Sequence, residues 1–348
     1  MYFTMTEQQA KQQKSVILLV NLGTPNKPNY WSTMHYLWAF LSDKRVIEIP
    51  RLLWYPLLYG VILPFRSLSS SKKYQKVYDQ QQGLPLRYHS EALVNKLQTQ
   101  INQDHSDITC LLAMRYANPN LVTILDTLKD NGVKNLFILP LFPQYSATTT
   151  ATIMDIVGKH LRTWRFLPNL EFINGYWDNP EYINTVCTLI KQHWQQHGKA
   201  EKLLISYHGL PKRNLNKGDP YYCFCHKTTR LIAQRLQLKP EDYEMVFQSR
   251  FGPSAWLQPY TEDKLIQCAK EGIKTLDIIA PGFVADCLET DDEIAREYAE
   301  IYQEAGGKEL RYIPAMNASD ASVNFFMHFL KTKCSFMQAQ NTTTTAHS

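Results

Sequence analysis

Short apolar runs recur along the chain, and each is followed by a longer stretch whose apolar residues have helical spacing. Most of the runs are continuous rather than alternating, which is typical of strands buried on both faces of a parallel sheet. The eight predicted strands are Val16–Leu22, Thr109–Met114, Asn135–Leu141, Leu170–Asn174, Leu203–Tyr207, Met245–Gln248, Thr275–Ala280 and Leu310–Ile313. The predicted helices are Ser90–Asn102, Leu121–Asn131, Ala147–Leu161, Glu181–His197, Cys225–Arg235, Thr261–Glu271, Asp286–Glu304 and Ala321–Lys331. This alternation predicts an α/β fold with doubly wound parallel sheets.

The eight strands suggest two sets of four, with the division placed near Arg165, and 348 residues are too many for one small core. We predict two Rossmann-like doubly wound domains, at residues 15–165 and 166–315, each with a four-stranded parallel sheet and with a cleft between them. Residues 316–335 are predicted to form a C-terminal helix that packs back on the first domain. The polar ends are predicted to be flexible at 1–14 and disordered at 336–348. Ligands of such folds bind beyond the carboxyl ends of the strands, so the residues that follow each strand are candidates for function.

One apolar segment interrupts this rhythm. Leu52–Phe65 contains fourteen residues without a charge, which is shorter than the roughly 20 residues that a membrane span requires. Basic residues flank it at Arg51, Arg66, Lys72 and Lys73. A buried helix is one interpretation. We favour a hydrophobic lip beside the cleft that contacts an anionic membrane surface.

Composition limits the classes of partner. The 20 Tyr and 7 Trp fit a large flat apolar ligand or a membrane-facing surface, although a Tyr-rich core would also explain them. A net charge of +5 without a dense basic run argues against nucleic acid. Seven cysteines, an odd and scattered set, indicate a reducing compartment, and the N-terminus has no apolar signal, so we expect a cytoplasmic protein. The one cluster, Cys223-Phe-Cys225-His226, does not have a common zinc spacing.

A histidine closes the fifth predicted strand, in the segment Ser206-Tyr207-His208-Gly209-Leu210-Pro211. A histidine after a strand is often structural. The position of His208 at the carboxyl edge, followed by a Gly-x-Pro turn, favours a functional role instead. Imidazole has an unperturbed pKa of about 6.5, so a neutral ring takes up a proton near neutral pH.

Three glutamates follow the seventh predicted strand, at Glu289, Glu293 and Glu297. Spacings of four residues align them along one face of a helix, where like charges repel one another by a few tenths of a kcal/mol per pair. A solvated helix face is one interpretation. The other is a row of oxygen ligands that passes protons or hard cations along the helix.

Together these residues lie within a set of ordered blocks that resembles the ferrochelatase family from about Val16 to Leu330. The blocks are VNLGTP at 20–25, MRY at 114–116, PLFPQYSATTT at 140–150, SYHGLP at 206–211, KGDPY at 217–221, QSRFGPSAWLQP at 248–259 and PGFVADCLET at 281–290. The resemblance implies insertion of Fe²⁺ into protoporphyrin IX to give protohaem, with iron and porphyrin as substrates. It also implies two Rossmann-like halves around a porphyrin cleft.

The resemblance assigns roles to individual residues. His208 corresponds to the histidine that accepts the pyrrole protons or first binds the metal, and Glu289 to the glutamate that faces it. Glu293 and Glu297 correspond to the acidic row that leads away from the site. The residues implied at the substrate are Leu22, Arg115, Tyr116, Tyr145, Ser146 and Trp256.

Departures from the family pattern refine these expectations. Leu22 stands where coproporphyrin-using relatives tend to have Tyr, which favours protoporphyrin. Some relatives carry His at the position of Cys287, which leaves the metal-side ligand set open. Only Cys334 lies near the C-terminus, so we expect no [2Fe–2S] cluster. The protein is expected to act as a monomer. A chelatase for coproporphyrin III, for sirohydrochlorin or for cobalt is the alternative, as is a non-catalytic carrier of haem or porphyrin.

Overall fold

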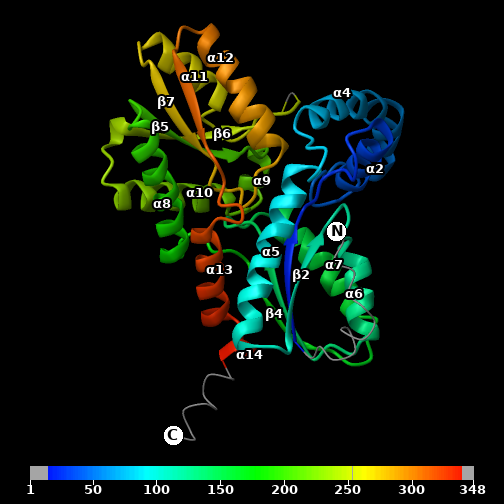
Figure 1. Ribbon diagram of the computed structural model, residues 1–348. Coiled ribbons are helices and arrows are strands. Elements are labelled where there is room, and N and C mark those ends of the chain that lie inside the picture. The colour runs from blue at the N-terminus through cyan, green and yellow to red at the C-terminus, as the bar shows by residue number, and fades with distance from the viewer. Residues whose placement is uncertain (1–14, 253, 339–348) are drawn as a thin grey trace, which may run out of the picture.

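A computed structural model describes residues 15–252 and 254–338 and contains two parallel four-stranded sheets (Figure 1). The first has the order β2-β1-β3-β4 and the second the order β6-β5-β7-β8. Their strands are β1 (Ser15–Asn21), β2 (Ile108–Met114), β3 (Asn135–Pro140), β4 (Asn169–Phe172), β5 (Lys202–His208), β6 (Tyr243–Gln248), β7 (Thr275–Ile279) and β8 (Glu309–Ile313). The predicted fold class and all eight predicted strands are confirmed. Each order reverses direction between its two central strands, β1 and β3 or β5 and β7, where such folds bind ligands.

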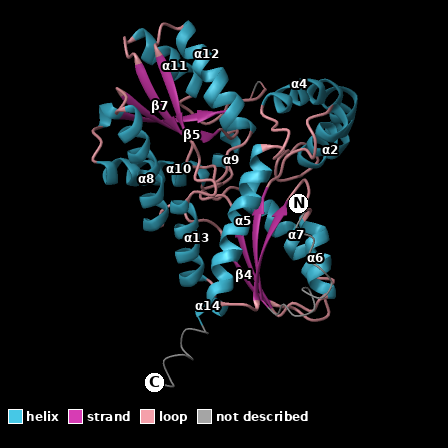
Figure 2. Ribbon diagram, viewed as in Figure 1, coloured by secondary structure: helices cyan, strands magenta, loops and turns pink. Residues whose placement is uncertain are grey.

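Helices cover the sheets, as the colouring by secondary structure shows (Figure 2). Those of the first unit are α2 (Tyr30–Leu41), α3 (Arg51–Leu57), η1 (Leu58–Ile62), α4 (Leu63–Lys76), α5 (Pro85–Asp104), α6 (Leu121–Asp130), η2 (Ala147–Ala151) and α7 (Thr152–Leu161). Those of the second unit are α8 (Pro180–His197), α9 (Lys212–Asn216), α10 (Tyr221–Leu236), η3 (Pro240–Asp242), α11 (Thr261–Lys270), η4 (Glu289–Tyr298) and α12 (Ala299–Glu304). The chain continues into α13 (Asp320–Lys333) and α14 (Ser335–Gln338).

The two sheets share one core. Ile17 and Leu19 of β1 pack in the same cluster of buried residues as Leu203 and Ile205 of β5. Val16, Leu18 and Val20 face the opposite side of the first sheet, toward α6 and α7. Side chains on a strand alternate between its two faces, so both faces of β1 are buried. This explains the continuous apolar runs in the sequence.

The predicted boundary at residue 165 is wrong. Strand β4 pairs in parallel with β3, with Asn169 opposite Asn135, so it belongs to the first sheet. The first unit therefore extends to Phe172. The boundary was misplaced because it was set between apolar runs, whereas the hydrogen-bonded pairing of a strand decides which sheet it joins.

The C-terminal helix α13 contacts α5 of the first unit and also α8 of the second. Figure 1 shows α13 and α5 side by side at the waist of the molecule. The predicted disordered tail from residue 336 begins too early, because Ser335–Gln338 form α14 and Met337 is buried in the shared core. The rest of that tail, and the predicted flexible segment 1–14, lie outside the described residues.

The charge-free segment Leu52–Phe65 is helical, and runs through α3, η1 and the start of α4. Trp54, Leu58 and Leu63 are buried in a small cluster against α2. The other side of the segment is open, and Leu52 and Leu53 are 92% and 72% exposed. The segment is therefore neither fully buried nor fully exposed. No helix within 15–252 and 254–338 is both long enough and apolar enough to span a bilayer.

Candidate active site

His208 is the last residue of β5, at the carboxyl edge of the second sheet. Its Nδ1 lies 2.7 Å from the carbonyl oxygen of Gly209. A carbonyl only accepts hydrogen bonds, so this contact places the proton on Nδ1 and leaves the Nε2 lone pair of a neutral ring available as a base. A residue larger than glycine would clash at position 209, because a Cβ there would lie 2.7 Å from the carbonyl oxygen of Gln248.

Glu289 begins η4, shortly after β7, and is tied to the same edge as His208. Gln248, the partner of His208 in the β5–β6 register, donates from Nε2 to the backbone oxygen of Glu289 at 3.3 Å. The Oε1 atom of Gln248 accepts a hydrogen bond from Ser206 at 2.7 Å. One buried glutamine side chain thus connects the strand that ends in His208 with the helix that begins with Glu289.

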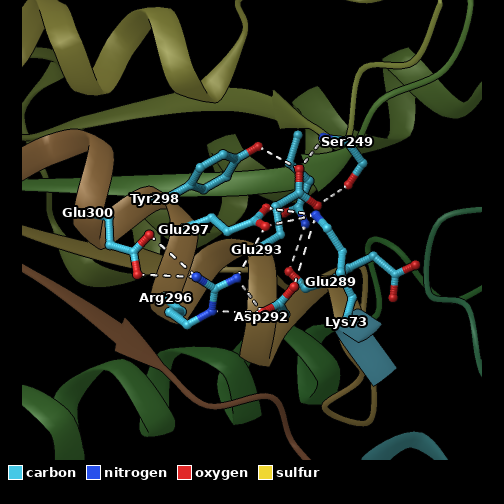
Figure 3. Close-up of polar contacts among 10 residues, drawn as sticks. Lys73, Ser249, Glu289, Asp292, Glu293, Arg296, Glu297, Tyr298 and Glu300 are labelled. Carbon is cyan, nitrogen blue, oxygen red and sulfur yellow. Dashed lines mark hydrogen bonds and ion pairs between the residues drawn. The ribbon is translucent and has the colours of Figure 1, made fainter. Parts of the chain in front are cut away.

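The acidic row lies on a π-helix, not on the α-helix predicted from the spacing. Such wide turns are rare and often occur at functional sites. The backbone N–H of Ser249 donates to Glu293 at 2.9 Å, the Ser249 hydroxyl also donates to it, and the Tyr298 hydroxyl does so at 2.8 Å (Figure 3). Ser249 has a φ of 62°, a left-handed conformation unusual for serine, which brings both of its donors toward one carboxylate.

Glu293 has a raised pKa. Burial that desolvates the carboxylate is the main cause, and the charge of Glu289 acts in the same direction. Hydrogen bonds from Ser249 and Tyr298, together with the nearby His208, partly offset this rise in the pKa. Glu293 therefore lies within electrostatic range of both predicted catalytic residues.

Farther along η4 the negative charges are balanced. Lys73 of α4 forms an ion pair with Glu297 at 2.8 Å and approaches buried Asp292 to 4.0 Å. Arg296 pairs with Asp292 at 2.6 Å and with Glu297 at 3.2 Å (Figure 3). The row thus passes from Glu289 at the sheet edge to a neutralised end against α4.

Helices α2 and α4 of the first unit also supply neighbours of Glu289. Tyr36 of α2 is half-buried and Tyr74 of α4 is buried, and the pKa values of both are raised by desolvation and by the charge of Glu289. Burial and the same carboxylate raise the pKa of the Cys287 thiol. Neutral hydroxyl and thiol groups therefore surround this side of Glu289.

On the first unit, three predicted substrate residues come together beyond β1 and β2. The backbone N–H of Tyr116 donates to the carbonyl of Leu22 at 2.9 Å, and that of Arg115 to the carbonyl of Asn21. These bonds extend the pairing of β1 with β2 past the ends of the strands. The next residue, Gly23, has a φ of 108°, and a Cβ there would lie 2.8 Å from the Cβ of Ala117.

The Arg115 guanidinium is paired within the protein. It bonds to Asp43 at 2.6 Å and to the Thr152 hydroxyl at 2.9 Å, and the Tyr116 hydroxyl donates to Asp43 at 2.9 Å. Burial opposes ionisation of Asp43, but the hydrogen bonds from Thr152 and the Arg45 backbone, with the charge of Arg115, hold the pKa of that carboxyl below its usual value. The charges of Arg115 and Asp43 therefore neutralise each other, and the network forms a fixed wall of the first unit.

The remaining predicted residues lie at neighbouring strand ends. Tyr145 and Ser146 follow β3, and Ser146 is buried, with its hydroxyl 3.0 Å from Asp219. Trp256 packs its ring over Gly209, beside His208, and its Nε1 is buried without a hydrogen-bond partner among the described residues. The structure therefore places Trp256 next to the candidate base.

Sequence reasoning assigned no role to several residues of this site. Gln248 and Ser249 stand in a block that carried the family resemblance, so their position after β6 was a usable signal. Lys73 had been noted only as a basic flank, and nothing marked Asp43. No group of three His, Cys, Asp or Glu side chains in 15–252 and 254–338 forms a preformed metal cage. Cys223 is exposed and Cys225 is buried.

Comparisons with known proteins find relatives along most of this chain. The family model described as Ferrochelatase matches residues 14–334. Ferrochelatase 2 of Shewanella oneidensis is 44% identical over 92% of this chain and 98% of its own length. The ferrochelatase of Janthinobacterium sp. (strain Marseille) is 46% identical over 88% of this chain and 83% of its own.

Solved structures support the fold. The Bacillus subtilis SirB structure with Fe³⁺ superposes with a TM-score of 0.55 and 11% identity, covering 92% of this chain and 96% of that one. The sirohydrochlorin chelatase SirB in complex with cobalt gives a TM-score of 0.53 at 10% identity, over 94% and 98% of the two chains. At such low identity the likeness concerns the fold alone. The family model and the sequence relatives go further: this chain belongs to the ferrochelatase family.

Proposed function

We propose that this protein inserts Fe²⁺ into protoporphyrin IX to form protohaem, the last step of haem synthesis, and releases two protons. One observation carries the proposal within the family assignment. A histidine with an available ring nitrogen and a glutamate lie at the same edge of the second sheet. Gln248 is the strand partner of His208 and donates a hydrogen bond to the backbone oxygen of Glu289. A base and a carboxylate are the groups that this reaction requires.

The reaction replaces two pyrrole protons by one metal ion. Both N–H groups point into the flat ring, so the ring must pucker before iron enters and the protons leave. Leu22, Tyr116 and Trp256 would hold the macrocycle in that shape, with binding of the rest of the ring offsetting the strain. His208 would accept protons through Nε2, and Glu289 would receive the iron or the second proton.

The acidic row would serve as a relay for protons or iron. Glu293 has a raised pKa because it is buried, so it holds a proton at a higher pH than an exposed carboxylate does. Glu297, paired with Lys73 and Arg296, would end the relay at the side of α4.

The decisive experiment offers Fe²⁺ anaerobically with an equal mixture of protoporphyrin IX and coproporphyrin III, and identifies the products by absorbance and chromatography. We expect protohaem to predominate, because Leu22 occupies the position that implies protoporphyrin. Predominance of coprohaem would reverse the substrate assignment. Tight binding of added haem by folded protein without any metal insertion would instead support a carrier.

We also propose that the charge-free segment contacts the inner face of the cell membrane while the protein remains in the cytoplasm as a monomer. Leu52 and Leu53 are 92% and 72% exposed, and Arg51 precedes them in the sequence. The variant Leu52→Glu with Leu53→Glu should lose most sedimentation with vesicles that contain anionic lipid.

A matched control is available for that test. Phe166 and Leu167 are 62% and 59% exposed but lie between α7 and β4, away from the charge-free segment. Changing both to Glu should leave vesicle binding unchanged. Equal binding by wild type and both double variants would refute membrane contact through this segment.

A further inference from the structure

We infer that Asp219 is a positioning residue, which rests on the proposed function and deepens it. Asp219 lies in the loop between α9 and α10 of the second unit. Its carboxylate fixes the Tyr145–Ser146 loop of the first unit, so that the Tyr145 hydroxyl is held in place for a propionate of the porphyrin. It acts through other residues and does not touch the substrate.

The contacts of Asp219 cross from one unit to the other. Its Oδ2 atom accepts hydrogen bonds from the Ser146 hydroxyl at 3.0 Å and from the Ala147 backbone N–H at 2.8 Å. Its Oδ1 atom accepts from the backbone N–H of Tyr221 at 3.0 Å. Three donors from two units therefore converge on one carboxylate.

This carboxylate occupies the start of a helix. Ala147 is the first residue of η2, which continues directly into α7, and Ser146 is its N-cap. Free N–H groups and the helix dipole make this end favourable for an anion. Asp219 supplies that anion from within the protein. The buried Ser146 hydroxyl already donates its hydrogen bond to the Asp219 carboxylate. A substrate propionate therefore does not bind at this helix end.

Tyr145 remains the side chain of this loop that is available to a substrate. It is partly exposed, and its pKa is raised by partial burial and then by the charge of Asp219, while Arg45 opposes the rise. Its hydroxyl is consequently protonated and able to donate. A protonated phenol held in place by the loop suits a carboxylate of the substrate.

The segment 217–221, which contains Asp219, also contacts β5, the strand that ends in His208. The Tyr221 hydroxyl donates to the backbone oxygen of His208 at 3.1 Å. Lys217 forms an ion pair with Glu48, in the loop that leads from α2 to α3. Residues 217–221 thus connect His208, the Tyr145–Ser146 loop and the approach to the charge-free segment, and Asp219 is the acceptor at the centre of that connection.

The variant Asp219→Asn tests this role without changing side-chain shape. An amide presents a single oxygen acceptor, so it cannot reproduce both sets of bonds. Porphyrin affinity is read without metal, from fluorescence quenching, for protoporphyrin IX and for its dimethyl ester, in which the propionate charges are absent. We expect the Kd for the free diacid to rise about tenfold and that for the diester to change less than about twofold, and Asp219→Glu to restore part of the diacid affinity.

The control is Asp178→Asn, which removes a surface partner of Lys227 in the same unit and should change neither Kd. Equal loss of affinity for diacid and diester, or no loss for either, would overturn the positioning role. Because binding is measured without iron, the result is independent of turnover. Failure of wild type to metallate either porphyrin, while Asp219→Asn still discriminates between them, would overturn the proposed function alone.

Discussion

The two sheets have the same strand order but present different chemistry at their carboxyl edges. At the first edge, Arg115 and Asp43 pair at 2.6 Å and form a closed network. At the second edge, His208 keeps a ring nitrogen available and Glu289 lies beside the protonated Cys287 thiol. A shared topology therefore does not imply a shared role. The first unit provides a network of internally paired charges, and the second provides the predicted catalytic base and carboxylate.

The largest effect should come from removing the predicted catalytic side chains of the second edge. We expect His208→Ala and Glu289→Ala each to lower turnover at least about a hundredfold, the scale of acid–base groups. The measurement is anaerobic conversion of protoporphyrin to haem. Glu300→Ala, an exposed partner of Arg296, is the control and should retain wild-type turnover. Near-normal rates for both site variants would remove the assignment.

Removing the buried Arg115–Asp43 pair should mainly lower the free energy of unfolding. Arg115→Ala leaves Asp43, whose side chain is 8% exposed, without its cation, and we expect a loss of about 2 kcal/mol in the free energy of unfolding. Arg45→Ala breaks the pair with Asp155, whose side chains are 44% and 51% exposed, and should cost under about 0.5 kcal/mol. Urea denaturation gives both values. Equal losses would show that burial does not distinguish the two pairs.

Removing a hydrogen bond to Glu293 should shift the pH dependence of turnover. The Ser249 hydroxyl holds the pKa of Glu293 down, so Ser249→Ala should raise that pKa further. The acid limb of the pH–rate profile should then move to higher pH, with turnover falling about tenfold on that limb for a shift of one unit. Ser69→Ala, which changes an exposed side chain of α4, is the control. A uniform loss of rate at every pH would contradict the relay.

The smallest effect concerns Asp291, next to the acidic row. Burial, and then the charge of Asp286, raise the pKa of Asp291 to about 7. The folded state therefore binds more protons than the unfolded state between about pH 4 and pH 7, and stability falls as pH rises through this range. Asp291→Asn should flatten that decline by about 1 kcal/mol per pH unit between pH 5 and pH 7. Asp130→Asn, on the surface, should leave it unchanged, and an identical slope in both variants would contradict the assignment.

Much of the fold could be predicted because burial repeats along the chain. Val16–Leu22 predicted β1 almost to its ends, since both faces of that strand lie in a core. The same alternation located His208 and Glu289 after their strands. The pattern assigned β4 to the wrong unit, because the sheet that a strand joins depends on hydrogen bonds to a strand distant in the sequence. Nothing in the periodicity of 289–297 distinguishes a π-helix from an α-helix.

By itself the sequence determined the strands, the helices and the residues that follow each strand, because these depend on local patterns of apolar and polar side chains. The tertiary structure alone decided which charges are neutralised and which are not. Lys73 meets Glu297 across 224 positions and Asp219 meets Ser146 across 73, contacts for which the chain carries no local signal. Packing brings these groups together, and the resulting burial and hydrogen bonds then set which carboxylates stay available for chemistry.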